Sequence, residues 1–426
     1  MLPAQLRSPM GPPRLDRRGA GVCETSSMAK AEDATAVATR HGRLPHRRAW
    51  VTAVRWVASG LAVVLVATVA VVGIEVSHFA QGLRERGVVI NASEAPIPEI
   101  GAIEGGFNIL VVGKDEYYDR DSVLNDVNIL LHVSEDQTSA VAVSFPRDMV
   151  MPFPPCTDPK TGRTSSAARG LPVNNAYAYG GLGCVVDVLR GFTGLEIQYA
   201  GLIGFDGVAS MADAVGGVPV CVASPIDDAF TGLHLDAGTH TLSGWEALMF
   251  LRTRHGVGDG SDLTRISSQQ VYLSALVRKL TAEGTLTNVT TIVGLAQIAS
   301  EKMELSAELT NPTTMVAMAR ALHNIPLERL TFVQYPGTTG GTGIYEGHVQ
   351  PDAGRGQKLL DAIRNDQSVG VAQAGDGVGA QLDPNATETP VDPSASPGDE
   401  PTLSEQVVID GIRGQSAADQ TCSIGR

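Results

Sequence analysis

The sequence predicts an α/β fold: a three-layer α/β/α domain with a mixed central sheet, preceded by one N-terminal transmembrane helix. Strand-like apolar runs alternate with helical segments over residues 101–366, and this alternation is typical of helices covering both faces of a sheet. A long uncharged run lies near the N-terminus. After residue 366 the composition shifts to Pro, Gly, Ala and acidic residues, which marks the end of the ordered domain.

Composition narrows the class of protein. The 426 residues, 43% of them hydrophobic, are enough for a sizeable core. The formal net charge of -14 argues against nucleic acid as a partner, because phosphate backbones select proteins with surplus Lys and Arg. Five cysteines exclude a disulfide-dense scaffold but permit isolated bridges.

The N-terminal apolar run predicts a membrane anchor. Residues 56–74 read WVASGLAVVLVATVAVVGI, which is long enough to cross a hydrocarbon layer of roughly 30 Å as a helix. Residues 1–55 carry ten Lys and Arg against four Asp and Glu, so the N-terminus is expected in the cytoplasm and the rest outside the cell. A cleaved signal peptide is the alternative, but the run is long for one and lacks a good cleavage site. We expect a single-pass protein of the cell membrane.

The strands and helices follow from apolar patterns and their breakers. The buried strands are expected at residues 107–113, 125–133, 138–146 and 330–336, since these runs are apolar and bounded by turn residues. The helices are expected at residues 184–194, 205–217, 245–254, 262–280, 284–302 and 312–323, several of them closed by glycine.

The remaining segments are predicted to lie outside this core. Residues 1–55 are expected to be largely disordered, and residues 75–100 to form a stalk whose prolines stop any helix. Residues 367–404 are predicted to be a disordered linker, because they have too few large apolar side chains to offset the chain entropy. Residues 405–426 regain a few apolar positions, and we expect this C-terminal tail to dock at an unspecified place.

A cationic segment at residues 252–270, RTRHGVGDGSDLTRISSQQ, predicts an anion site. Arg265 falls in the first turn of a helix, where the free N–H groups and the helix dipole favour a phosphate. Ser261 or Asp262 can cap that helix. The glycine-rich loop would fold Arg252 and Arg254 back toward Arg265. The alternative is a solvated charged turn without a ligand.

Acidic residues follow the predicted strands. Asp115 comes just after the first strand, Asp126 begins the second, and Arg147 and Asp148 follow the third. Ligands of open α/β sheets gather at strand ends, and paired carboxylates there suit Mg²⁺. Taken alone, aspartates such as Asp115 and Asp126 are more often turn or capping residues than metal ligands.

Other chemistries find less support in the sequence. There is no G-x-S-x-G nucleophile motif, no phosphate-binding G-x-x-x-x-G-K-S/T loop and no zinc spacing of cysteines. Cys156 and Cys184 flank a polar loop and are either bridged or buried as free thiols. Cys221 follows an apolar run and is interpreted as a core residue, and Cys422 stays unassigned.

Seven segments in order resemble the motifs of the LytR-CpsA-Psr proteins, membrane-anchored enzymes of Gram-positive cell walls. The segments are FNILVVGKD, NDVNILLHV, VAVSFPRDM, VNNAYAYGG, FDGVASMADAVGGVPVCV, GLHLDAGTHTLSGWEALMFLRTRH and GDGSDLTRISSQQ, spread over about residues 107–281. The GDGSDL form, the cysteines and the few lysines look like an actinobacterial member.

The resemblance implies transfer of a glycopolymer from a polyprenyl-pyrophosphate carrier to peptidoglycan by a phosphotransferase-type ligase, with Mg²⁺ as cofactor. It implies that Asp115 and Asp126 hold the metal, with one of them deprotonating the acceptor hydroxyl. The guanidinium groups expected on the pyrophosphate are those of Arg147, Arg252, Arg254 and Arg265. Substrate-binding residues are expected at Asp148, Asn174, Asp262, Gln269, Gln270 and Arg120.

Two further expectations concern the donor. Attack on the sugar carbon would expel a pyrophosphate whose charge the guanidinium groups and the metal stabilise. The polyprenyl chain would lie in an apolar cleft lined by helical residues 185–190, 207–215 and 272–280, and membrane lipid would surround the anchor.

The chain departs from the family pattern at Tyr117, Leu124, Asn125 and Ser268, where the pattern has other residues, several of them arginine. Fewer cations would then face the donor. These departures motivate one alternative, a non-catalytic protein that binds polyprenyl pyrophosphate. A second alternative is a pyrophosphatase that acts on the same carrier, since water could replace the sugar acceptor. The polymer itself is not specified by the sequence.

Overall fold

The computed structural model describes residues 50–51, 54–61, 87–90, 106–115, 123–282, 289–386 and 405–426. The chain divides into two compact units, Met1–Thr68 and Val69–Arg426. In the first unit the described residues are helical. Among all described residues, no helix combines the length and the apolar character that crossing a membrane requires. The predicted span at 56–74 lies outside the described residues from position 62 onward.

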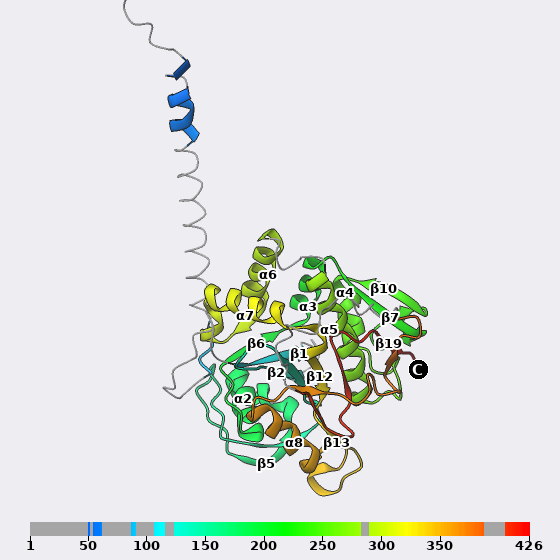
Figure 1. Ribbon diagram of the computed structural model, residues 1–426. Coiled ribbons are helices and arrows are strands. Elements are labelled where there is room, and N and C mark those ends of the chain that lie inside the picture. The colour runs from blue at the N-terminus through cyan, green and yellow to red at the C-terminus, as the bar shows by residue number, and fades with distance from the viewer. Residues whose placement is uncertain are drawn as a thin grey trace, which may run out of the picture. The chain divides into compact units, whose positions relative to one another are not determined.

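A seven-stranded mixed sheet forms the centre of the second unit (Figure 1). Its order is β11-β6-β1-β2-β3-β12-β18. The strands are β1 (Phe107–Asp115), β2 (Leu124–Val133), β3 (Ala140–Ser144), β6 (Tyr199–Ile203), β11 (Met303–Leu305), β12 (Leu330–Gln334) and β18 (Gly414–Ser416). β1, β2 and β3 are antiparallel neighbours, whereas β6 runs parallel to β1 and β12 parallel to β3. The predicted mixed α/β sheet is confirmed.

Helices cover both faces of this sheet, which explains why its strands are apolar on both sides. On one face, Leu110 and Val143 share a core with α2 (Ala176–Thr193) and α8 (Ala353–Arg364). On the other, Phe107 and Phe332 pack with α5 (Asp262–Ala282) and α7 (Pro312–Asn324). The two helix layers lie on opposite sides of the sheet in Figure 1.

The other predicted helices are also present, with shifted ends. These are α3 (Phe205–Ala214), α4 (Gly244–Arg252) and α6 (Val289–Lys302). The helix predicted from residue 184 instead begins at Ala176 as α2, with a kink at Gly180 and Gly181. The helix therefore continues on the N-terminal side of these two glycines, eight residues before the predicted start.

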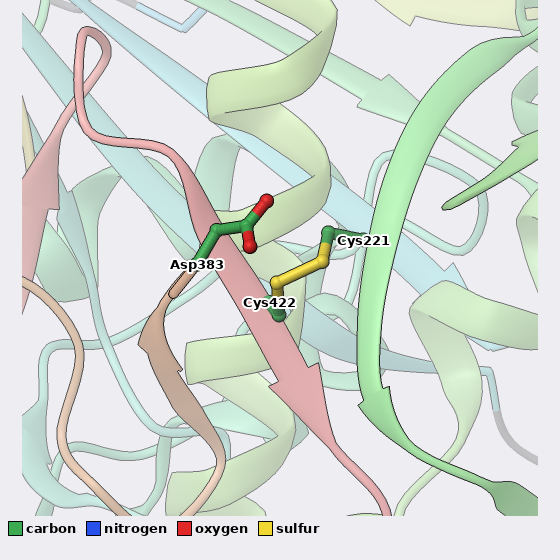
Figure 2. A group of neighbouring side chains, drawn as sticks. All are labelled: Cys221, Asp383 and Cys422. Carbon is green, nitrogen blue, oxygen red and sulfur yellow. A yellow bond between two sulfur atoms is a disulfide. The ribbon is translucent and has the colours of Figure 1, made fainter. Parts of the chain in front are cut away.

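A second sheet packs beside α4 and α5 and has the order β10-β7-β19-β16. It consists of β7 (Val218–Ser224), β10 (Gly238–Leu242), β16 (Ala380–Leu382) and β19 (Thr421–Ile424). Cys422 of β19 lies opposite Cys221 of β7, and a disulfide joins them (Figure 2). Asp383 lies beside them, but the two sulfur atoms are bonded to each other and are not metal ligands.

The prediction that residues 367–404 are disordered is wrong for its first half. Residues 367–386 contain β15 (Val369–Gly370) and β16, and residues 387–404 lie outside the described residues. β15 pairs with β17 (Val407–Val408) and β16 pairs with β19. The C-terminal strands β17 and β19 thus stabilise residues 367–386 by pairing with them. The composition of residues 367–404 alone does not reveal this pairing.

Short strands and turns complete the unit. These are β4 (Val150–Phe153), β5 (Ala168–Pro172), β8 (Ile226–Asp228), β9 (Leu233–Leu235), β13 (Gly337–Thr338) and β14 (Gln350–Pro351). Of the predicted stalk, only residues 87–90 are described, and Val88 forms a bridge with Ser306. A second disulfide joins Cys156 to Cys184, which decides between the two interpretations of these cysteines.

The two disulfides differ in the length of chain that they close. Cys221–Cys422 spans 201 residues and Cys156–Cys184 spans 28. A cross-link restricts the unfolded chain more when its loop is longer.

We expect Cys221→Ser with Cys422→Ser to lower the free energy of unfolding by about 2–5 kcal/mol, measured by chemical denaturation. The matched Cys156→Ser and Cys184→Ser pair should cost less, and an equal or larger cost would contradict this ranking.

Candidate active site

A cavity of about 450 Å³ opens on the α5 face of the central sheet. Strands β1, β2 and β6 form its floor, and α3, α4 and α5 form its walls. One part of its lining is apolar and the other carries cations and carboxylates. The apolar part comprises Val111, Val127, Ile129, Ile203, Phe205, Val208, Leu248, Leu251 and Leu273.

Four arginines from three separate segments line the polar part: Arg147 follows β3, Arg252 and Arg254 lie at and just after the end of α4, and Arg265 lies in the first turn of α5. The Nε of Arg254 donates to the Gly260 carbonyl at 3.0 Å. This bond holds the glycine-rich loop folded, so that the arginines on either side of it face one cavity, as the sequence predicts.

Asp126 and Asp262 tie two of these arginines together. Arg147 Nη1 donates to Asp126 Oδ2 at 2.5 Å, and its Nε lies 3.3 Å from Asp262 Oδ1. Arg265 Nη2 lies 2.7 Å from the same Asp262 oxygen and donates to the Asp126 carbonyl at 3.1 Å. Partly buried ion pairs of this kind are costly to break from one side. The network therefore fixes the guanidinium groups before any ligand binds.

Burial and neighbouring charges both shift the pKa values of Arg147 and Asp148. Burial alone would lower the pKa of Arg147, but Asp126, Asp262 and Asp148 raise it above its ordinary value. Burial raises the pKa of Asp148, and the nearby charge of Asp262 adds to that rise against Arg147. Arg147 therefore stays charged under all physiological conditions.

Asp115 and Asp126 lie on neighbouring strands at a β-bulge. The pairing of β1 and β2 shifts between Gly113 and Lys114, which leaves Asp126 as the extra residue on its strand. Bulges of this kind redirect side chains, and both carboxylates line the cavity. Asp115 Oδ1 lies 4.0 Å from Arg252 Nη2. Asp126 Oδ1 is buried and makes no hydrogen bond within the described part of the chain.

Asp228 is a functional residue that sequence reasoning missed. Its buried carboxylate accepts hydrogen bonds from Thr253 Oγ1 at 2.6 Å and from the backbone N–H groups of Arg254 and His255, each at 3.1 Å. The Gly256 N–H adds a fourth at 3.3 Å. This carboxylate thus orients the loop that carries Arg254. No sequence signal marked it, because its partners in the 253–256 loop lie 25 to 28 residues away.

The C-terminus holds the same loop from its other side. The Gly258 N–H donates to the Ile424 carbonyl, and the Arg426 N–H donates to the Gly256 carbonyl, both at 3.0 Å. Ser268 is fully buried, and its Oγ lies 2.7 Å from the Ser423 Oγ. Position 268, where the family pattern has arginine, therefore faces the C-terminal strand in this chain.

The remaining predicted site residues that the structure describes lie in the cavity lining, behind Arg147, or in the core away from the cavity. Gln269 lines the cavity, and its Nε2 donates to the Leu251 carbonyl at 2.9 Å. Asp148 and Asp262 lie behind Arg147 as its ion-pair partners, and the Asn174 N–H donates to the Arg147 carbonyl. Gln270 is buried away from the cavity, against Gln415. Arg120 and Tyr117 lie outside the described residues.

The expected apolar cleft is only partly lined as predicted. Val208 of α3 and Leu273 of α5 line it. Residues 185–190 of α2 do not, because their apolar members, Val185, Val186, Val188 and Leu189, are buried in the core on the opposite face of the sheet. The Arg252 guanidinium lies 4.2 Å from the centre of the Phe205 ring. This cation–π contact marks the boundary between the apolar and polar parts.

Asn125, another departure from the family pattern, has a structural role here. Its fully buried side chain donates to Asn128 Oδ1 and to the Val173 carbonyl and accepts from the Tyr177 N–H. All its polar atoms are therefore satisfied, as burial requires. It joins the start of β2 to the start of α2, next to Asp126.

Comparison with known proteins finds a match to the LytR_cpsA_psr family over residues 84–361. Cell wall biosynthesis protein LcpA of Corynebacterium glutamicum is 28% identical in an alignment of 282 residues that covers 58% of this chain and 54% of LcpA. The chain thus spans about half the length of that relative. The polyisoprenyl-teichoic acid–peptidoglycan teichoic acid transferase TagT of Bacillus subtilis is 23% identical over 299 residues, covering 67% of this chain and 85% of TagT.

A solved structure shows the same fold. The crystal structure of B. subtilis TagV matches with a TM-score of 0.50 at 21% identity, over 62% of this chain and 98% of that chain.

Asp228 gives a prediction about pH. Burial would raise its pKa, but hydrogen bonds from Thr253 and from backbone N–H groups outweigh burial and lower the pKa. A lowered folded-state pKa stabilises the fold above the unfolded pKa of about 4, and this contribution is lost as the pH falls through the folded value. We expect Asp228→Asn to cost about 1–3 kcal/mol near neutral pH and to flatten the acid dependence of stability below about pH 4.

The measurement is the free energy of unfolding by urea at a series of pH values. Asp227→Asn, one position earlier and exposed, is the matched control and should leave the pH dependence unchanged. An Asp228→Asn curve parallel to wild type in acid would show that the loop does not depend on this carboxylate.

Proposed function

The chain belongs to the LytR_cpsA_psr family, and from that premise we propose that it transfers a glycopolymer from a polyprenyl-pyrophosphate carrier to peptidoglycan. The observation that carries the proposal is the two-part cavity, with an apolar part joined directly to a cluster of arginines. A lipid pyrophosphate has the same two parts. Relatives named as teichoic acid transferases to peptidoglycan support the acceptor class.

The arginine end is suited to a pyrophosphate. Guanidinium groups bind phosphate oxygens through paired, charge-assisted hydrogen bonds. Arg265 also lies in the first turn of α5, where the helix dipole favours an anion. The polyprenyl chain would extend from this end along Phe205, Val208 and Leu273 in the apolar part.

The same geometry favours attack on phosphorus rather than on the sugar carbon. Attack on carbon builds positive charge on the sugar ring and relies on a carboxylate beside it. Among the described residues that line the cavity, Asp228 is committed to the 253–256 loop, and Asp115 and Asp126 face arginines. Arginines around the phosphates would instead stabilise negative charge that builds on their oxygens.

The proposed step is a phosphoryl transfer. An acceptor hydroxyl of peptidoglycan attacks the sugar-side phosphorus and forms a new P–O bond. The bond from that phosphorus to the bridging oxygen breaks, and the carrier leaves as polyprenyl monophosphate. Asp115, at the end of β1, takes the hydroxyl proton, while Arg147 and Arg265 hold the phosphates in place.

The residues fit Mg²⁺. The Asp126 carboxylate lines the cavity, and its buried Oδ1 has no hydrogen-bond donor among the described residues. Asp115 supplies a second carboxylate from the neighbouring strand. Mg²⁺ prefers a few carboxylates together with phosphate oxygens. Asp115 and Asp126 would hold the ion, which when bound would offset the charge of the phosphates.

A membrane location is part of the proposal. The apolar run at residues 56–74 and the basic residues before it support a single-pass anchor with the second unit outside the cell. The two disulfides of that unit agree with an oxidising compartment. Anchoring would keep the site beside a lipid-borne donor and raise its effective concentration.

Arg252→Ala tests the arginine cluster. The Arg252 side chain is 28% exposed and that of Arg265 only 8%, so replacing Arg252 perturbs the fold less. We expect at least about a 100-fold loss in transfer of a labelled lipid-linked oligosaccharide to peptidoglycan in Mg²⁺, with unchanged thermal unfolding. The control is Arg364→Ala on α8, which should retain full activity.

Three outcomes of this assay would count against parts of the proposal. Wild-type activity in Arg252→Ala would remove the arginine cluster from the mechanism. Binding of the donor by wild type without transfer would indicate a non-catalytic binding protein. Release of phosphate without transfer would indicate a pyrophosphatase acting on the carrier.

The identity of the lipid product tests the position of attack. Attack on phosphorus releases polyprenyl monophosphate, whereas attack on the sugar carbon releases polyprenyl pyrophosphate. We expect mass spectrometry of the wild-type reaction to detect the monophosphate as the lipid product and a phosphodiester in the polymer linkage. Polyprenyl pyrophosphate as the product would rule out phosphoryl transfer.

A further inference from the structure

An exposed aromatic pair stands at the arginine end of the cavity. The Phe230 ring is 77% exposed, yet the residue lines the cavity together with His255. The two rings lie against each other, with centroids 4.3 Å apart and planes inclined by 34°. Single exposed apolar side chains are common on proteins and need no explanation. Phe230 differs from such residues because it lines the cavity and because a hydrogen bond fixes its backbone.

The backbones of both residues are held by one buried carboxylate. The Phe230 N–H donates to Asp228 Oδ1 at 3.0 Å, and the His255 N–H donates to Asp228 Oδ2 at 3.1 Å. The Thr231 N–H donates to the Asp228 carbonyl and closes the turn between β8 and β9. The same carboxylate therefore sets the aromatic pair and the backbone of Arg254 in one fixed arrangement.

The position of Phe230 and His255 in the cavity indicates which part of the donor these two rings would face. If the lipid chain occupies the part lined by Phe205 and Leu273, the pyrophosphate lies among Arg252, Arg254 and Arg265. The group attached to the far phosphate then emerges at the arginine end. His255 follows Arg254 in the chain and carries the Phe230 ring against its own ring, so the first sugar of the donor would pass over the Phe230 ring.

We propose that Phe230, backed by His255, forms a stacking platform for the sugar joined directly to the donor pyrophosphate. This inference rests on the proposed function. One face of a pyranose ring presents C–H bonds with partial positive charge, and the face of an aromatic ring carries partial negative charge. The two surfaces attract each other and exclude water. The platform recognises a sugar ring, whereas the arginines recognise only phosphate.

Two lipid probes that differ by one sugar test the platform. The first is geranylgeranyl pyrophosphate, and the second is the same lipid pyrophosphate bearing N-acetylglucosamine. For the full chain in detergent micelles, Phe230→Ala should weaken binding of the sugar-bearing probe about five- to tenfold. It should leave binding of the sugar-free probe within about twofold, because no arginine contact changes.

Two further variants sharpen the comparison. Phe230→Trp keeps an aromatic face and should restore binding of the sugar-bearing probe. Trp245→Ala removes another exposed aromatic residue, 52% exposed on α4 and outside the cavity lining, and should change neither affinity. Thermal unfolding of Phe230→Ala should match wild type, since an exposed ring contributes little to stability.

Any other binding result would contradict either the stacking platform or the proposed function. Equal weakening of both probes would show that Phe230 supports the pyrophosphate or lipid and not the sugar. Unchanged binding of both would remove the platform. Loss of binding to phosphatidylglycerol vesicles, with both probe affinities unchanged, would assign the ring to the membrane surface. If wild type fails to bind even the sugar-free probe, the proposed function itself fails, independently of Phe230.

Discussion

The site depends on one buried carboxylate shared by two arginines. Asp262 is 6% exposed, and its Oδ1 lies within ion-pair distance of both Arg147 and Arg265. Those arginines reach Asp126 as well. The cluster thereby joins the bulge in β2, the loop after β3 and the first turn of α5. A buried charge is tolerated only when its partners are in place. These three segments therefore cannot move apart independently, and the cation cluster is formed before a donor arrives.

A second constraint comes from parts of the chain beyond the family match. That match ends at residue 361, yet Ile424 and Arg426 hydrogen-bond to the glycine-rich loop that lies between Arg254 and Arg265. The Cys221–Cys422 disulfide fixes the strand that brings them there. Asp228 holds the beginning of the same loop. A loop with several glycines has high conformational entropy, so its order depends on these long-range contacts.

Local pattern predicted most of the fold, because strand and helix signals act over a few residues. The strands at 107–113 and 125–133 and the helix at 262–280 are present nearly as predicted. The predictions that were wrong or incomplete concern features that depend on tertiary contacts. The first half of α5 is buried because it lies between two sheets, so Ser268 and Gln270 do not reach the cavity, whereas Arg265 and Gln269 do. Asp228 and the docked C-terminal strand gave no local signal, since their partners are distant in sequence.

The charge balance of the site bears on how it would accept a pyrophosphate. Among the described residues, the cluster and its immediate neighbours hold five cations, Lys114, Arg147, Arg252, Arg254 and Arg265. They also hold five carboxylates, Asp115, Asp126, Asp148, Asp228 and Asp262. The arginines are thus already neutralised, and a donor anion would have to share them with aspartates. A divalent cation on Asp115 and Asp126 would remove two of those competing charges. The carboxylates that appear to weaken an anion site are then the reason that anion and metal would bind together.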